Sequence, residues 1–279
     1  MQLSVVIITF NEEANIGRTL ASVQPLVADG KGETIVVDSG SSDRTVEIAK
    51  SYGARVFVQE WTGYATQKNS AIDKAAGDWI LSLDADEEVD SELNEELTGH
   101  RGDNLPRTPG EWCLTMQQSG NLEYLKGAPI AFLVRRKNYF LGRWIKRGGF
   151  WPDSKLRLFR RGTGRFEDRA VHEDVRVEGP SKLIPRGALI HHSYPRLSDY
   201  IEHMNRYSSL GAEMVVAKGK VRFSFTNIVL RPLFTFIYNY FLRLGFLDGR
   251  EGLLLHLYHA VYVSWKYAKA WELSRSNTS

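Results

Sequence analysis

Two stretches near the start of the chain share one design, in which a near-continuous run of Val and Ile ends in small polar residues and then turns helical. The first runs from Ser4 to Thr9 and the second from Thr34 to Asp38. Near-continuous apolar strands are typical of parallel sheets that are covered on both faces. The repeat predicts a doubly wound α/β fold whose strand ends gather at one edge.

The remaining segments of the first hundred residues fit the same alternation. Asn11 and Asp43 are candidate N-caps for the first two helices, because short polar side chains can accept a hydrogen bond from the first turn. Gly53 precedes the third apolar run, and Gly77 precedes the fourth. The expected order is helix 14–23, helix 44–51, strand 55–58, helix 66–76 and strand 79–83.

Two carboxylates, Asp84 and Asp86, stand one residue apart where the fourth strand ends. Side chains alternate along a strand, so both would point the same way. Two hard oxygen donors at this edge suit Mg²⁺ or Mn²⁺ carried by a phosphate group, and ligands of open α/β sheets bind there. The pair predicts a charged leaving group that needs a metal. A surface turn with two solvated acids is the alternative.

Five motifs occur in an order that resembles a known family. They are Ser4–Glu13, Val36–Thr45, Gln67–Asn69, Gly77–Trp79 and Leu83–Glu87. Over roughly residues 3–95 they resemble the nucleotide-sugar half of family 2 glycosyltransferases with the GT-A fold. Four later motifs resemble a narrower branch, the bacterial lipopolysaccharide core β-glucosyltransferases. They are Arg157–Arg160, Val171–Glu173, His191–Ser193 and Gly245–Gly249.

The resemblance implies three parts for the chain. Residues 1–98 would be the nucleotide-sugar-binding half, and residues 99–195 the acceptor and catalytic half of the same GT-A domain. Residues 196–279 would be a helical C-terminal extension, because the pattern turns helical from Leu197 onward.

The resemblance also implies roles around the nucleotide. Asp38 would accept a hydrogen bond from the uracil N–H of a UDP-sugar. Thr9, Asn11 and Glu13 lie at the first strand-to-helix turn and are expected to contact the base and ribose. Lys68 is a candidate partner for the donor phosphates, although a solvated helix face would also explain it.

For the metal, the family pattern implies that Asp86 is a direct ligand, and that Asp84 lies nearer the ribose or a water of the metal shell. His191 matches the His of a His-x-Ser motif, which suits a third metal ligand or a phosphate donor. A core histidine after an apolar pair is the simpler reading. The expected cofactor is Mg²⁺ or Mn²⁺.

An inverting sugar transfer needs one general base for the acceptor hydroxyl. Glu173 and Asp174 are the candidates, with Glu173 placed slightly ahead, because the broad family and the narrower branch favour different positions. Asp153 is a further candidate, and a surface turn is the structural alternative for the pair.

Charge and hydropathy predict the partners. Residues 134–169 hold twelve basic and three acidic residues in a chain of net charge +3. That block suggests an anionic partner such as a phosphorylated sugar or lipid headgroups rather than nucleic acid. Residues 223–247 are apolar and aromatic but interrupted by Arg231 and Arg243. They fit helices at a membrane interface or packed on the domain better than a spanning helix.

Together these features predict a metal-dependent inverting transferase that moves a hexose, glucose by the resemblance, from a UDP-sugar donor to a glycolipid acceptor such as lipopolysaccharide core. No secretory signal pattern opens the sequence, and Cys113 is the single cysteine. The expected location is cytoplasmic, peripheral on the inner face of the cell membrane. The alternatives are a polyprenyl phosphate acceptor and a non-catalytic protein that binds sugar nucleotides or glycans.

Overall fold

The computed structural model describes residues 2–99, 129–167, 174–219 and 221–276. Cys113 and Glu173 therefore lie outside the described residues. The chain forms two compact units. We call Met1–Arg136 with Ser154–His191 the sheet unit, and Lys137–Asp153 with His192–Ser279 the helical unit.

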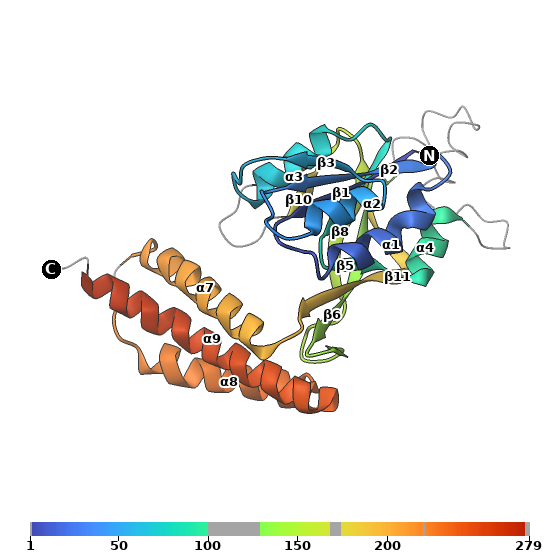
Figure 1. Cartoon of the computed structure of the whole chain (residues 1–279). Helices are drawn as coiled ribbons and strands as arrows, with labels where there is room; N and C mark the ends of the chain where they lie inside the picture. The colour runs from blue at the N-terminus through green and yellow to red at the C-terminus, as the bar shows by residue number, and fades with distance from the viewer. Residues whose placement is uncertain (1, 100–128, 168–173, 220, 277–279) are drawn as a thin grey trace. The chain divides into compact units, whose positions relative to one another are not determined.

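Four parallel strands make the first half of the main sheet. They are β1 (Leu3–Thr9), β2 (Gly32–Asp38), β3 (Arg55–Val58) and β4 (Trp79–Asp84). They lie side by side in the order β3-β2-β1-β4, and all three pairings are parallel (Figure 1). The strands expected from the apolar runs are confirmed, and the near-continuous burial of β1, β2 and β4 is typical of strands that are covered on both faces.

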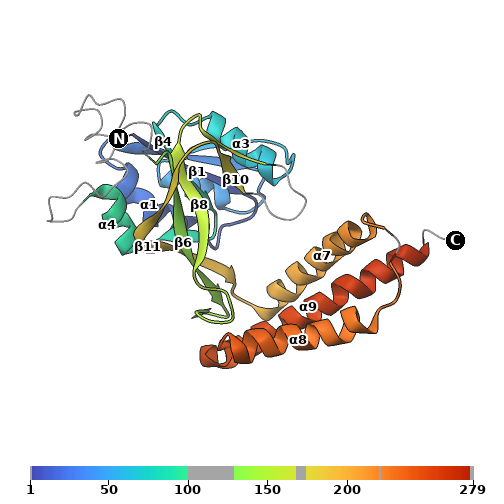
Figure 2. The same ribbon diagram turned by 180° about the vertical axis from the view of Figure 1, so that it is seen from behind.

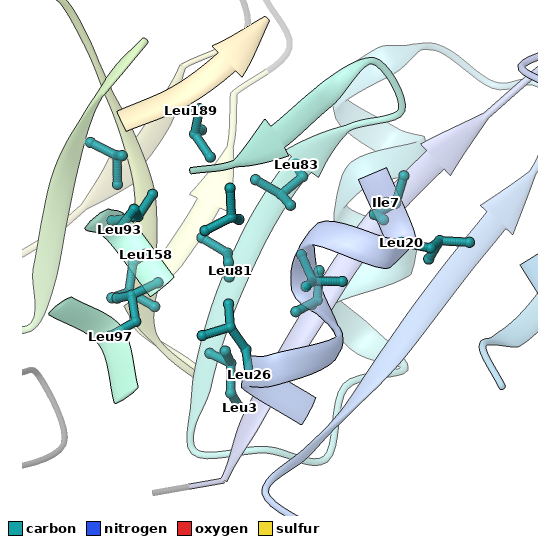
Figure 3. Close-up of a cluster of buried hydrophobic side chains, with 14 of the residues drawn as sticks. Leu3, Ile7, Leu20, Leu26, Leu81, Leu83, Leu93, Leu97, Leu158 and Leu189 are labelled. Atoms are coloured by element: carbon teal, nitrogen blue, oxygen red, sulfur yellow. The ribbon is translucent and has the colours of Figure 1, made fainter. Parts of the chain in front are cut away.

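Helices cover both faces of this half-sheet. They are α1 (Ile16–Val27), α2 (Thr45–Ser51), α3 (Tyr64–Asp73) and α4 (Ser91–Thr98). Alternate residues of β1 divide between two cores: Ile7 packs in one cluster with Leu20 of α1, and Val6 in the other with Ile72 of α3. Figure 3 shows the first cluster, in which Leu81 and Leu83 of β4 also lie. The expected doubly wound α/β fold is confirmed.

The second half of the sheet is mostly antiparallel. Its strands are β5 (Glu87–Val89), β6 (Ala131–Phe140), β8 (Asp153–Arg160) and β11 (Ser181–Tyr194), in the order β4-β8-β6-β11-β5 (Figure 2). β8 pairs antiparallel with β4, and β11 with β5. The short β7 (Arg143–Trp144) pairs with β6. Separately, β9 (Gly164–Phe166) and β10 (Val175–Val177) form a two-stranded sheet.

The helical unit contains the long helices α7 (Leu197–Val216) and α9 (Gly249–Ser276). Between them run η1 (Thr226–Leu230), α8 (Arg231–Ile237), η2 (Tyr238–Leu242) and η3 (Gly245–Asp248). α9 packs along both α7 and α8 (Figure 1). The C-terminal helical region expected from the sequence is confirmed. Among the described residues, no helix combines the length and apolar character needed to cross a membrane.

Glycines leave room for the buried His256 ring within the helical unit. A side chain added at Gly148 would come within 1.9 Å of the imidazole Cε1, and one at Gly245 within 2.3 Å of Nε2. Next to them, the buried Asp248 accepts hydrogen bonds from the backbone N–H groups of Lys146 and Arg147. The motif at 245–249 thus packs against His256 through Gly245 and binds the backbone at 146–147 through Asp248.

Helix starts differ from the sequence-based expectation. α1 begins at Ile16 with Asn15 at its N-cap position, and Arg44 holds that position for α2. Asn11 and Asp43 are therefore not N-caps. The reason is local: Asn11 adopts a left-handed backbone with φ 54°, and its amide serves a neighbouring turn instead.

Candidate active site

Three strand ends bring the predicted polar residues to one edge of the sheet. In the registers of the parallel strands, Thr9 of β1 lies beside Asp38 of β2, and Ile8 lies beside Asp84 of β4. Thr9, Asp38 and Asp84 therefore share the carboxyl edge, which is where open α/β sheets bind ligands.

The Asp38 carboxylate is buried, and its neighbours hold it in place. Oδ1 accepts from the N–H groups of Gly40 and Ser41, at 2.9 and 2.8 Å. Oδ2 accepts from the hydroxyls of Thr9, at 2.8 Å, and Ser41. A carboxylate has about four lone-pair sites, so protein donors already use all of them. In this arrangement Asp38 organises the turn, and its expected bond to a uracil N–H would require one of these donors to be displaced.

The turns after β1 and β2 are tied together. The Asn11 amide oxygen accepts from the N–H of Ser42 at 2.9 Å, and the Asn11 N–H donates to the hydroxyl of Ser41 at 2.8 Å. The Glu13 N–H donates to Asp43 at 3.1 Å. Asn11 and Glu13 thus help to shape the edge, and no hydrogen bond here tests their expected contact with base or ribose.

Asp84 lies between two cations. Its Oδ1 is 2.8 Å from Lys68 Nζ, and its Oδ2 is 2.6 Å from an Arg157 guanidinium nitrogen. Burial acts to raise the pKa of Asp84, but the charges and hydrogen bonds of Arg157 and Lys68 outweigh it and hold that pKa well below its usual range. Lys68 is therefore no solvated surface lysine: only 7 % of it is exposed.

Glu87 also belongs to this cluster, and the motif at 83–87 contains it without an assigned role. It is fully buried, yet it accepts from Arg157 at 2.7 Å and from Arg136 at 3.3 Å. Its other oxygen accepts the backbone N–H of Asp84 at 3.0 Å. Glu87 therefore fixes both the backbone of Asp84 and the arginine that pairs with Asp84. Arg157 is part of the motif at 157–160 that supports the family resemblance, but the resemblance assigned it no role.

Asp86 pairs with His191 across a different contact. Asp86 Oδ2 lies 3.2 Å from His191 Nε2, since β11 pairs with β5 at the next residue, Glu87. Burial acts to raise the pKa of Asp86, but the charge and hydrogen bond of His191, together with a backbone hydrogen bond, leave that pKa below its usual value. The structure thus brings Asp86 and His191 together, and the roles expected for them stay predictions.

A further carboxylate belongs to this acidic edge. Burial raises the pKa of Glu12, and the negative charges of Asp86, Asp43 and Asp84 raise it further against a hydrogen bond from Asn15. Several carboxylates within electrostatic reach favour a cation at this edge. A cation bound there would relieve their mutual repulsion.

The fit of a divalent metal follows from these contacts. Within the described ranges, no group of three or more His, Cys, Asp or Glu side chains could hold an ion. Mg²⁺ and Mn²⁺ do not need such a cage when a nucleotide diphosphate brings them, because one or two carboxylates then suffice. Asp86, with a single histidine partner, fits a direct ligand better than Asp84, whose two oxygens already face Lys68 and Arg157.

Of the candidates for the general base, Asp153 and Asp174 lie within the described residues. Asp174 is exposed just before β10, and its backbone oxygen accepts from the N–H of Glu167. Asp153 belongs to the helical unit, where its carboxylate accepts from the Asn138 amide at 3.0 Å. The structure therefore leaves Glu173 and Asp174 as predictions.

The basic block at 134–169 is not one surface. Arg136 and Arg157 are turned inward onto Glu87, and Arg161 donates to the backbone oxygen of Gly77. The two units also divide the block, because residues 137–153 belong to the helical unit. Part of the positive charge thus neutralises buried carboxylates, and only the rest is available to an anionic partner.

The sequence of the chain matches a known family. Residues 4–104 match the family model described as glycosyl transferase family 2. The chain is 31 % identical to an uncharacterised glycosyltransferase of Rickettsia typhi over 98 % of this chain and 88 % of that protein. The chain belongs to glycosyl transferase family 2. This glycosyltransferase is also 29 % identical to the lipopolysaccharide core biosynthesis glycosyltransferase LpsC of Rhizobium meliloti, over 98 % of this chain and 93 % of that protein.

Among solved structures, the enzyme is similar to Staphylococcus aureus TarS 1–349 in complex with UDP-GlcNAc. The identity is 15 % and the TM-score 0.45, with 99 % of this chain and 92 % of that chain covered. Family membership itself rests on the sequence relatives and on the motifs gathered at the sheet edge.

Proposed function

We propose that this glycosyltransferase is metal-dependent and inverting, and that it moves a hexose, glucose, from a UDP-sugar to a glycolipid acceptor such as lipopolysaccharide inner core. The acceptor is supported by the likeness to a protein named for lipopolysaccharide core biosynthesis over nearly the whole chain. The donor side is supported by one observation above all. Asp84, Asp86, Lys68 and Arg157 meet at the carboxyl edge of the sheet, with both signs of charge in reach of a metal diphosphate.

In this mechanism the cations next to Asp84 change partners. Lys68 and Arg157 pair with the Asp84 carboxylate, and a diphosphate would offer them oxygens of higher charge. Glu87 keeps hold of Arg157 while this happens, because the contact between them is buried. Both side chains then hold the leaving group in position for displacement.

Asp86 would hold Mg²⁺ or Mn²⁺, with Asp84 near the ribose or a metal-bound water and His191 as a further ligand or phosphate donor. The metal when bound stabilises the negative charge that develops on the departing UDP. Asp38, Thr9, Asn11 and Glu13 would line the base and ribose.

On the acceptor side, Glu173 or Asp174 removes the proton of the attacking hydroxyl in a single displacement. Because the acceptor is a glycolipid, the enzyme works at the surface of the membrane that carries it, which we place at the cytoplasmic face of the inner membrane. A polyprenyl phosphate is the alternative acceptor.

A donor screen tests the proposal. The purified full chain is mixed with UDP-, GDP- and TDP-sugars, with Mn²⁺ or with a chelator, and released nucleotide is measured. We expect UDP-glucose to be hydrolysed in the presence of Mn²⁺ and spared by the chelator. A preference for a GDP-sugar would overturn the role of Asp38. Donor binding without hydrolysis or transfer, at any metal concentration, would support the non-catalytic alternative.

A further inference from the structure

The segment η1–α8–η2, residues 226–242, carries an apolar stripe on its exposed side. The exposed fractions run from 41 % at Ile237 to 67 % at Leu242. The spacing is three and four residues, which is the repeat of one helix face. We call this set the apolar stripe: Val229, Leu230, Leu233, Phe234, Ile237, Tyr238, Phe241 and Leu242.

The opposite side of the same segment is the more polar one. Asn227, Thr235 and Asn239 are half-buried there, together with Phe236 and Tyr240. α9 covers this side, and the Ser264 hydroxyl donates to the backbone oxygen of Ile228. A helix of a water-soluble protein normally turns its apolar face to the core. This segment instead turns its apolar face outward. We therefore expect that face to contact an apolar partner rather than water.

The charges around the stripe identify that partner. Residues 221–250 contain four exposed arginines, namely Arg222, Arg231, Arg243 and Arg250. The one acid in this range is Asp248, which is buried and accepts backbone hydrogen bonds. Arg231 lies within the segment and Arg243 directly after it, and apolar helix faces that have arginine and aromatic residues nearby are typical of helices in the headgroup region of anionic membranes.

A second copy of the chain fits the same face less well. In a twofold dimer each patch meets its own equal, so arginines from both copies would approach one another. Residues 221–250 offer no exposed carboxylate to pair with them. Burying unpaired charge is costly, whereas lipid phosphates at a bilayer surface would neutralise it.

We propose that the apolar stripe inserts into the interfacial layer of an anionic lipid bilayer, with the segment 226–242 lying along the surface. This docking rests on the proposed glycolipid acceptor and gives it a physical route, since the enzyme and its acceptor then share one surface. It needs no spanning helix, and none is found among the described residues.

Liposome co-sedimentation tests the docking. The full chain is mixed with vesicles of phosphatidylcholine, with or without about one third phosphatidylglycerol. The test variant is the double substitution Phe234→Ser with Leu242→Ser, at the two most exposed positions of the stripe. Inserting one large apolar side chain is worth about tenfold in partition, so the double variant should bind anionic vesicles about a hundredfold more weakly. The matched control is Leu183→Ser with Met214→Ser, two exposed apolar residues outside the stripe.

The outcomes separate the possibilities. Weaker binding of the stripe variant, with an unchanged control, supports the docking. Equal binding of both variants and wild type overturns it. The docking is also overturned if the wild-type chain does not bind vesicles but elutes as a dimer, and the stripe variant elutes as a monomer. That result would assign the face to a second copy. UDP-sugar hydrolysis is measured on the same samples without lipid. If vesicles are bound but no donor is hydrolysed, the proposed function fails and the docking stands.

Discussion

Lowering the pH should destabilise the helical unit through one buried histidine. His256 is 1 % exposed, and neither of its ring nitrogens has a hydrogen-bond partner in the described part of the chain. Burial lowers the pKa of the imidazole to about 4, with His259 acting in the same direction and Asp248 against it. The folded chain thus keeps His256 neutral at pH values at which the unfolded chain protonates it.

The size of the effect follows from the two pKa values. Stability falls wherever the unfolded chain binds more protons than the folded one. With 6.5 in the unfolded chain and about 4 in the folded chain, the loss in the free energy of unfolding is about 2 kcal/mol at pH 5 and about 3 kcal/mol at pH 4. From about pH 8 upward both states are neutral and the full stability is present.

Urea unfolding followed by tryptophan fluorescence, at pH 8, 6 and 5, measures this loss. The comparison variant is His256→Gln, which cannot titrate and has a similar volume. Other groups titrate alike in both proteins, so the difference between their stabilities isolates His256. The variant should lose about 2 kcal/mol less than wild type between pH 8 and pH 5. A difference that stays constant within about 0.5 kcal/mol would refute the reasoning.

Three other predictions concern the site and the helical unit. Asp86→Ala should abolish Mn²⁺-dependent UDP binding in calorimetry while the chain still folds, and wild-type binding would sink the metal assignment. Of Glu173→Gln and Asp174→Asn, the one at the general base should lose turnover by about 10²–10⁴ and keep donor affinity. If both stay active, the base lies elsewhere and Asp153 is tested next. Asp248→Ala should reduce the free energy of unfolding by about 3 kcal/mol in urea, because two backbone N–H groups lose a charged acceptor. A loss below about 1 kcal/mol would mean that water replaces the carboxylate.

The fold was readable where the pattern was strong and local. The strand at 55–58 and the helix start at Leu197 agree with the structure to the residue. The start of α1 differs from the prediction, because Asn11 uses its left-handed backbone and its amide in a turn rather than in a helix cap. A cap and a turn need the same residue type, so the sequence alone does not separate them.

The site was readable only in part for a similar reason. Asp84 and Asp86 lie together in the sequence, and their position at a strand end is a local property. Glu87, Arg136 and Arg157 were missed because their contacts join residues 49 and 70 positions apart. Such pairs depend on which strands become neighbours, and β8 lies beside β4 only once the sheet has formed. The motif at 83–87 contains Glu87, but the sequence alone does not show that this acid is buried.

The linked turns after β1 and β2 have a consequence for how tightly this edge can bind a ligand. Hydrogen bonds join Asn11 to Ser42 and Glu13 to Asp43 within these turns. A nucleotide that binds there does not have to order these loops, and each side chain already immobilised avoids about 0.5–1.5 kcal/mol of entropic cost. Affinity at this edge therefore depends on preorganisation as well as on contacts. Replacing Asn11 by Gly would keep the left-handed backbone yet release the Ser42 N–H, so it would add the entropic cost of ordering the turn to the loss of the proposed contact with base or ribose.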